Sequence, residues 1–314
     1  MSSRNIGTLI KKLRIQQGIT QEELAYPLVE QSSMSRIESG QIMPNRRTIE
    51  LLLERLGCDY RDIDIFVDNK EEKIYTMQKE LEGLLVIESA FSDQDERTAK
   101  ADEILKKLED DKEFMAERMN QQYVLTYKAF SAWFKKTDKE LVLQMYMDAI
   151  KISIPEYDEN KVDKYYLSTQ EVRLITMTTA VYRDIGRVDD AIKILSLLKK
   201  NFEEQCIDKT ARGESYPVIL NNLVLMFFYG KKYEETVKMC DRAAEVCKEI
   251  GERGYRFLPV ITAYKANSLY LLGDRSESLR LFRQTYYTAE MFGMHNWKEM
   301  MKAGIKELFD IEIA

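Results

Sequence analysis

The side chains that most often carry out chemistry in proteins are few in this sequence and widely separated. Its cysteines are Cys58, Cys206, Cys240 and Cys247, none of them in a CxxC pair, and its one histidine is His295. A structural zinc site needs four closely placed Cys, His or acidic ligands, so we expect no metal and no cofactor. Four thiols in so long a chain make no disulfide framework and are expected to be inert in a reducing compartment.

Nucleotide and hydrolytic chemistry have no better support. The sequence contains no GK[ST] motif, which a phosphate-binding loop requires. Acidic residues such as Asp241 and Glu245 are expected on solvated helix faces and form no recognisable catalytic set. We therefore expect that the protein is not an enzyme.

The elements that position the remaining polar side chains must be mostly helices. Only 13 glycines and 5 prolines occur in 314 residues, which favours long helices over a sandwich or a barrel. Hydrophobic residues make up 45% of the chain, enough for a packed core, and the length suggests about two domains. The N-terminal residues lack the apolar core of a signal peptide, and no run is long enough to span a membrane. The sequence thus predicts an all-α cytoplasmic protein with no membrane partner.

The first 66 residues predict four or five short helices joined by tight turns. Apolar residues recur at helical spacing in TLIKKLRIQQG, and Gly18 ends that helix. Thr20 and Glu23 have the spacing of a capping box, in which hydroxyl and carboxylate satisfy free N–H groups at the start of a second helix. Pro27 must end or kink this second helix early.

A third and a fourth helix follow. Met34 and Ile37 share one face of the third, which Gly40 ends. Pro44 opens the fourth, whose apolar residues are predicted to point inward and which Gly57 closes. These inward residues are Ile49, Leu52, Leu53 and Leu56.

The segments GITQEELA and SRIESG, followed by a proline and an apolar helix, resemble the Cro/repressor-type (XRE) helix-turn-helix. The resemblance is closest to PlcR-type regulators, in which the turn between the second and third helices is one residue shorter than in most phage repressors. Residues 25–38 are likewise one residue short of the phage pattern. Pro27 departs from the family pattern and leaves the exact end of the second helix open.

This resemblance implies that the third helix lies in the major groove of DNA, where its first side chains contact base edges. Glutamine can pair with adenine, serine with either base class, and arginine with guanine or a phosphate. The start of the fourth helix would bind a phosphate through its free N–H groups. The DNA-binding candidates are Gln21, Gln31, Ser32, Ser33, Arg36, Asn45, Arg46, Arg47 and Thr48. The alternative reading makes Ser32, Ser33 and Ser35 plain exposed turn residues. Arg14 and Glu38 match positions that form an internal ion pair in the family.

The charge distribution bears on how such a domain would bind. The chain has a net charge of -6, but residues 1–66 contain nine basic and nine acidic residues, so this segment is neutral. A single neutral module gains little from phosphate contacts, which favours a homodimer on two half-sites of a double-stranded DNA operator.

A connector helix is expected after Phe66, in residues 67–94. Ile74, Met77, Leu81 and Leu84 follow one another at spacings of three and four, which is typical of an amphipathic helix with a narrow apolar seam. The seam can pack on the protein's own C-terminal domain or on a partner subunit.

The chain is repetitive from about residue 95 to residue 314. Turn glycines at 186, 230 and 273 each separate an apolar helix end from a helix that begins with acidic and small residues. A weaker copy surrounds Trp133. The pattern resembles tetratricopeptide (TPR) repeats, although its period exceeds the standard 34 residues. Ala191, Thr236 and Ser278 occupy the small positions where two helices must approach closely. Such helix pairs stack into a right-handed array with a concave face.

A concave array of this kind implies a peptide or protein ligand. Asparagine can pair with both polar groups of a peptide backbone, and Arg173 or Arg183 could hold a terminal carboxylate. The candidates, from the first helix of each pair, are Tyr127, Arg173, Thr176, Arg183, Asn221, Asn222, Tyr264, Asn267 and Tyr270. The tyrosines can equally be core residues and the asparagines solvated helix residues. Tyr286, Tyr287 and the last helix, with Trp297 and Leu308, are expected to cap the array.

The combined architecture resembles the RRNPP family of cytoplasmic peptide-pheromone receptors, which includes PlcR- and Rgg-type quorum-sensing regulators. That resemblance implies a dimeric transcription regulator whose array binds a short signalling peptide, with the peptide shifting the population of DNA-binding conformations. Two alternatives stay open: a regulator whose array binds a protein partner, and an adaptor that sequesters a phosphorelay protein.

Overall fold

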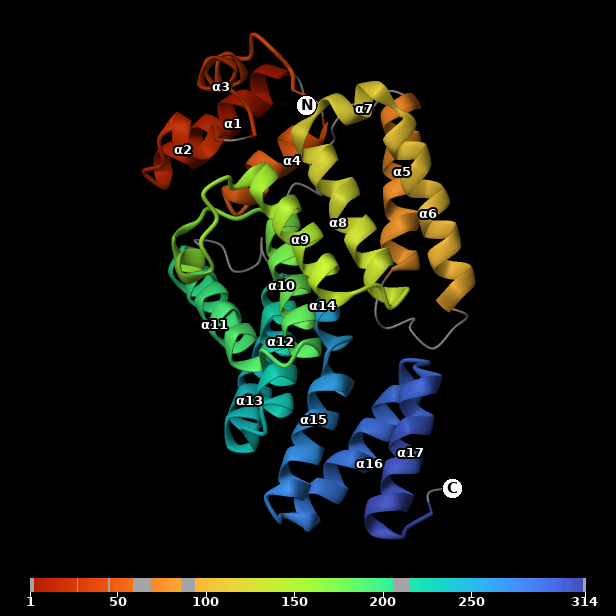
Figure 1. Cartoon of the computed structure of the whole chain (residues 1–314). Helices are drawn as coiled ribbons and strands as arrows, with labels where there is room; N and C mark the ends of the chain where they lie inside the picture. The colour runs from red at the N-terminus through yellow and green to blue at the C-terminus, as the bar shows by residue number, and fades with distance from the viewer. Residues whose placement is uncertain are drawn as a thin grey trace. The chain divides into compact units, whose positions relative to one another are not determined.

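The computed structural model describes residues 3–26, 28–44, 46–58, 69–85, 94–205 and 215–312, and all regular elements in these ranges are helices (Figure 1). The described residues up to Ile185 form one compact unit, and those from Gly186 onward form the bulk of a second. Each unit is described by itself. The all-α prediction is confirmed, and no helix in the described part of the chain is long and apolar enough to cross a membrane.

The first unit begins with four short helices, called the head below. They are α1 (Ser3–Gln16), α2 (Gln21–Ala25), α3 (Gln31–Glu38) and α4 (Arg46–Arg55). Their apolar faces form one core in which Ile10, Met34 and Ile49 are completely buried. The predicted inward residues Leu52, Leu53 and Leu56 and the α3 residue Ile37 belong to the same core.

Local signals set the ends of these helices. The Thr20 hydroxyl accepts a hydrogen bond from the Glu23 amide, and the Glu23 carboxylate accepts one from the Thr20 amide, which confirms the capping box. Gly18, Gly40 and Gly57 all have positive φ, the conformation that ends a helix at least cost when no Cβ is present. Helix α2 ends at Ala25, while Pro27 lies outside the described residues.

The rest of the first unit is a stack of helices that starts with the connector. Its elements are α5 (Asn69–Leu84), α6 (Gln94–Asp110), α7 (Lys112–Ala116), α8 (Arg118–Phe134), α9 (Lys139–Ser153), the 3₁₀ segment η2 (Glu159–Lys164) and α10 (Thr169–Asp184). Helix α5 runs beside α6 (Figure 1). Of the predicted apolar seam, Leu81 is buried and Ile74, Met77 and Leu84 are half-buried. The predicted boundary at residue 66 lies outside the described residues.

The second unit continues the helical pairs. It contains α11 (Val188–Gln205), α12 (Ser215–Tyr229), α13 (Tyr233–Ile250), α14 (Glu252–Tyr255), α15 (Leu258–Leu271), α16 (Arg275–Met291) and α17 (His295–Phe309). The predicted small residues Ala191, Thr236 and Ser278 are completely buried. The Ser278 hydroxyl donates to the Ala266 carbonyl of α15 at 2.7 Å, so α15 and α16 approach at this small side chain.

The predicted turn glycines are used in two different ways. Gly186 and Gly273 have positive φ, whereas at the middle turn Lys231 adopts this conformation instead of Gly230. A Cβ on Gly230 would lie 3.1 Å from the Met226 carbonyl oxygen and 3.4 Å from the Val188 side chain. This glycine therefore allows close packing rather than an unusual backbone angle.

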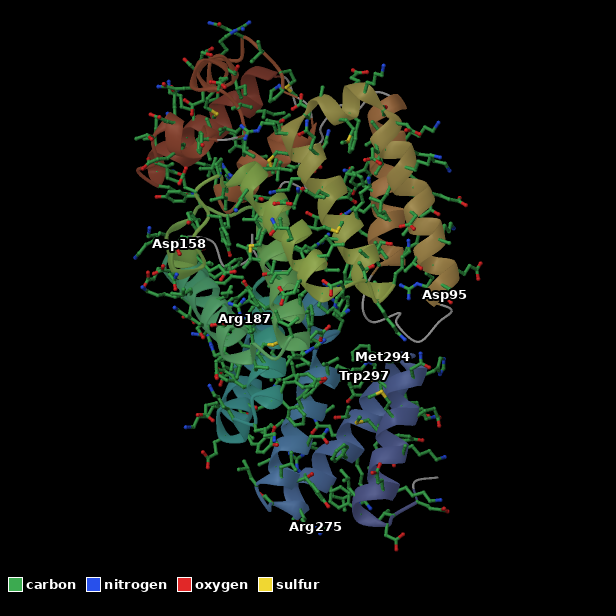
Figure 2. All side chains as sticks on the ribbon, in the orientation of Figure 1. Asp95, Asp158, Arg187, Arg275, Met294 and Trp297 are labelled. Carbon is green, nitrogen blue, oxygen red and sulfur yellow. The ribbon has the colours of Figure 1, made fainter. Side chains whose placement is uncertain are left out.

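Helix α17 closes the array at its C-terminal end. Met294 and Trp297 lie at the turn between α16 and α17, and Arg275 lies at the other end of α16 (Figure 2). Trp297 and Leu308 pack against a core that contains Phe282 and Tyr286, while Tyr287 is exposed. The capping packing expected for Trp297, Leu308 and Tyr286 is therefore present.

Candidate functional site

Helix α3 has one buried and one exposed face. Met34 and Ile37 lie in the head core, with 0% and 1% of their surfaces exposed. Gln31, Ser32 and Arg36 are exposed, and Ser33 is half-buried. The side chains predicted to contact bases therefore share the outer face of the helix, which a groove of DNA could reach.

A buried ion pair holds α3 against α1 and α2. The Arg14 guanidinium donates to both carboxylate oxygens of Glu38, with N–O distances of 2.6 and 2.9 Å. A third bond runs from Arg14 to the Ile19 carbonyl, and the Gln21 amide donates to Glu38 Oε2 at 2.7 Å. Burial opposes ionisation of Glu38, but the hydrogen bonds from Arg14 and Gln21 outweigh it and lower the pKa of this carboxyl. The ion pair implied by the family resemblance is therefore present, and Gln21, one of the DNA-binding candidates, is hydrogen-bonded to it.

The remaining DNA-binding candidates lie at the start of α4. Arg46, Arg47 and Thr48 occupy its first turn, and Thr48 is buried, with 8% of its surface exposed. Asn45 lies outside the described residues. The first turn of α4 thus offers backbone N–H groups, and the base and phosphate contacts of these residues stay predictions.

In the first unit, two of the predicted ligand-binding residues touch each other. Arg173 on α10 donates to the hydroxyl of Tyr127 on α8, and its guanidinium lies 3.4 Å from a carboxylate oxygen of Glu82 on α5. The Tyr127 hydroxyl and the Glu82 carboxylate raise the pKa of Arg173, so this side chain stays cationic. Its side chain is 41% exposed, so an anionic group in solution could compete for it.

The other two candidates of this unit are held by their neighbours. The buried Thr176 hydroxyl donates back to the Val172 and Arg173 carbonyls of its own helix. Arg183 pairs with Asp184, which also accepts from the Trp133 indole N–H at 2.8 Å.

In the second unit, the asparagine candidates differ in how their amides are satisfied. Asn222 and Asn267 donate to carbonyls one turn earlier in their own helices, at 2.8 and 2.9 Å. The Asn221 carbonyl oxygen on α12 is buried and accepts no hydrogen bond from any described residue. A buried acceptor without a donor costs about 1–3 kcal/mol. The Asn221 side chain therefore has an unmet requirement for a donor among the described residues.

The tyrosine candidates of this unit take part in aromatic contacts. The Tyr264 ring meets Phe228 edge-on at 5.1 Å, and the Tyr270 ring meets Phe309 at 5.5 Å. Arg275 lies 5.2 Å from the Tyr270 ring centroid. These tyrosines thus contribute to packing between helices, the alternative that the sequence leaves open.

Sequence reasoning missed the acidic partners and one helix start. Glu82 lies on the connector helix, and nothing local marks it as the partner of Arg173. The start of α10 carries a detectable signal, because Ser168 and Glu171 have capping-box spacing and form that box in the structure.

Cys240 and Cys247 are both buried, and Cys206 lies outside the described residues. Burial raises the pKa of Cys240 to about 12 and that of Cys247 to about 11, so neither is an activated nucleophile. No group of three or more His, Cys, Asp or Glu residues in the described ranges could hold a metal ion.

These features define a helix-turn-helix head joined to an array of helical pairs. Residues 5–64 match the family described as "Helix-turn-helix domain", so this segment is a helix-turn-helix domain. A comparison with curated protein sequences finds no match.

The fold of the whole chain is similar to that of several solved regulators. PlcR of Bacillus thuringiensis, in complex with the peptide PapR7 and DNA, is 18% identical with a TM-score of 0.58, covering 95% of this chain and 99% of PlcR. The competence regulator ComR of Streptococcus vestibularis, in its apo form, is 16% identical with a TM-score of 0.55. The match covers 98% of this chain and 99% of ComR. The same ComR in complex with its signalling peptide XIP is 16% identical with a TM-score of 0.51. This match covers 98% of this chain and 99% of ComR. At these identities the likeness shows a shared fold.

Proposed function

We propose that this protein is a sequence-specific DNA-binding transcription regulator, with residues 1–66 as the DNA-binding domain, 67–94 as a linker helix and 95–314 as a regulatory and dimerisation array. The observation that carries the proposal is the outer face of α3. In a helix-turn-helix domain this face enters the major groove, and here it presents Gln31, Ser32 and Arg36 to solvent.

A short signalling peptide bound to the concave face of the array is the proposed regulator. The complexes formed by proteins of similar fold support it, since PlcR binds both PapR7 and DNA, and ComR binds XIP. Each unit offers one polar group that supports this proposal by itself. In the second unit, the Asn221 acceptor would be satisfied by a peptide N–H. In the first unit, the 41% exposed Arg173 pairs with Glu82 and is a cation for which a carboxylate would compete.

Base contact by α3 can be tested by substitution. We expect Gln31→Ala and Ser33→Ala to weaken binding of the full chain to duplexes selected from a random-sequence library by about 10-fold or more, because each good base contact contributes about 1–3 kcal/mol. Binding to unselected DNA should hardly change. Fluorescence anisotropy titrations at one fixed salt concentration measure both affinities.

Gln284→Ala is the matched control, because Gln284 is an exposed helical glutamine of the second unit. If Gln31→Ala lowers the affinity for selected and unselected duplexes equally, that result would argue against base contact.

Peptide sensing is tested at the asparagines. We expect Asn221→Ala and Asn267→Ala to reduce the change in DNA affinity that the peptide fraction of spent culture medium causes, by about 10-fold in effective concentration. Removing the unmet acceptor of Asn221 should not lower the melting temperature. Ser196→Ala, at an exposed position on α11, serves as control. An unchanged response in both asparagine variants would remove these residues from the site.

A further inference from the structure

The head is joined to the rest of the first unit at the beginning of α10. Arg55, the last residue of α4, places its guanidinium 3.0 Å from Glu171 of α10, and the two side chains are only 3% and 2% exposed. Next to it, the Glu54 carboxylate accepts a hydrogen bond from the Thr169 amide at 3.0 Å. Consecutive head residues therefore both bind the first turn of one helix that lies over 110 residues away in the sequence.

Each charged group in this joint also has partners on its own side. Arg55 donates to the Leu24 and Tyr26 carbonyls at the end of α2, at 3.2 and 2.6 Å. Glu171 uses its other oxygen to accept from the amide and the hydroxyl of Ser168, at 2.7 and 2.9 Å. The ion pair thus connects the end of α2 in the head to the cap of α10. A charge buried at such a place is costly unless it is paired, so the two sides are held together.

The same turn of α10 is fixed to the array. The Gln170 amide donates to Gln122 of α8 at 2.7 Å, and Gln122 in turn donates to the Ser153 hydroxyl of α9 at 2.6 Å. Arg173, one half-turn beyond Glu171, binds Tyr127 of α8 and Glu82 of the connector helix. Apolar packing accompanies these bonds, because Met119 of α8 belongs to the core of the head.

We propose that the first turn of α10 is the joint that sets the orientation of the DNA-binding head on the array, with Glu171 as its positioning residue. The proposal rests on the proposed function. Residues 169–173 contact the head, the connector helix and α8, so a ligand that draws Arg173 away from Glu82 acts on the helix turn that holds Arg55. The outer face of α3 is exposed while the joint is closed, so the joint orients the head without covering its DNA-binding residues.

The test uses two variants that separate the ion pair from the helix cap. Glu171→Gln keeps a side-chain oxygen for the Ser168 amide, as a glutamine does in a capping box, but removes the negative charge opposite Arg55. Arg55 retains its two carbonyl partners within the head. Ser168→Ala is the matched control, since it removes the cap hydroxyl and leaves the ion pair. Glu54→Ala, at a half-buried position, is a second joint variant in case Glu171→Gln fails to fold.

Hydrogen exchange of the full-length protein provides the first measurement. In Glu171→Gln, we expect peptides from α4 and from the start of α10 to exchange about 10-fold faster, while peptides from α16 and α17 stay unchanged. Ser168→Ala should speed exchange at the start of α10 only. If peptides from α4 exchange at the wild-type rate in both Glu171→Gln and Glu54→Ala, the proposal is overturned, whatever the DNA measurements show.

The second measurement distinguishes orientation from simple loss of stability. On duplexes selected by the wild-type protein, we compare affinity at the selected half-site spacing with affinity after insertion of about five base pairs, half a helical turn. We expect the ratio of the two affinities to fall about 10-fold in Glu171→Gln and to stay unchanged in Ser168→Ala. A merely destabilised head would lose affinity equally at both spacings, and that result overturns the positioning role. If the wild-type protein selects no duplex, the proposed function fails, and hydrogen exchange alone decides on the joint.

Discussion

Replacing Gly7 by alanine is expected to unfold the head, with a loss of about 3 kcal/mol or more in its free energy of unfolding. Gly7 lies on α1 where this helix crosses α3. A Cβ at Gly7 would lie 2.0 Å from the Ile37 carbonyl oxygen and 3.0 Å from the Ile37 carbonyl carbon. Both are backbone atoms of the helix that carries the DNA-binding candidates, so no change of rotamer relieves the clash. Either α3 moves away from α1 or the core of the head opens.

Gly83 on α5 provides a matched control for this substitution. Nothing lies within 4 Å of a Cβ built there, and its helix is otherwise regular. Gly83→Ala should therefore stabilise the protein by about 0.5–1 kcal/mol, because alanine loses less backbone entropy in a helix. Urea unfolding followed by circular dichroism measures both variants, and DNA binding by Gly7→Ala should be lost. A Gly7→Ala protein with wild-type stability would contradict the close approach of α1 and α3.

The sequence predicts features of this fold whose cause is local. The Thr20–Glu23 capping box, the helix-ending Gly18 and Gly40, and the small buried Ser278 were all found because each is decided within a few residues. Helical spacing of apolar residues likewise predicts which faces are buried, since burial follows from a period that can be counted along the chain.

The parts that the sequence did not predict depend on partners far away in the chain. Gly7 lies inside a helix, and no neighbouring residue in the sequence explains why a glycine is needed there. Its role depends on the backbone of Ile37. Arg55 and Glu171 are 116 residues apart, and nothing in the sequence around either residue indicates which residue it pairs with. Such pairs depend on how helices pack, which periodicity alone does not determine.

Replacing Arg14 by methionine is expected to destabilise the head by about 3–5 kcal/mol, because it leaves Glu38 as an unpaired buried carboxylate. The Arg14 and Glu38 side chains are 12% and 2% exposed, and Glu38 connects α3 to both α1 and α2. Methionine keeps the apolar stem of arginine, so the loss comes from the charge and its hydrogen bonds. Urea unfolding at pH 7 measures the difference from the wild-type protein. Arg280→Met serves as control, because the Arg280–Glu277 pair is open to solvent and its loss should not change stability measurably.

The pH dependence of this difference identifies its cause. The folded state lowers the pKa of Glu38, so the unfolded chain binds the proton more readily and the pair adds stability above the unfolded pKa, about 4.3. That contribution is lost as the pH falls through the lower folded pKa. The difference in free energy of unfolding between the wild-type and Arg14→Met proteins should therefore be largest near pH 7 and shrink below about pH 4. A difference that stays constant down to pH 3 would mean that Arg14 stabilises the head through packing of its stem, and that the ion pair with Glu38 contributes little to holding α3 in place.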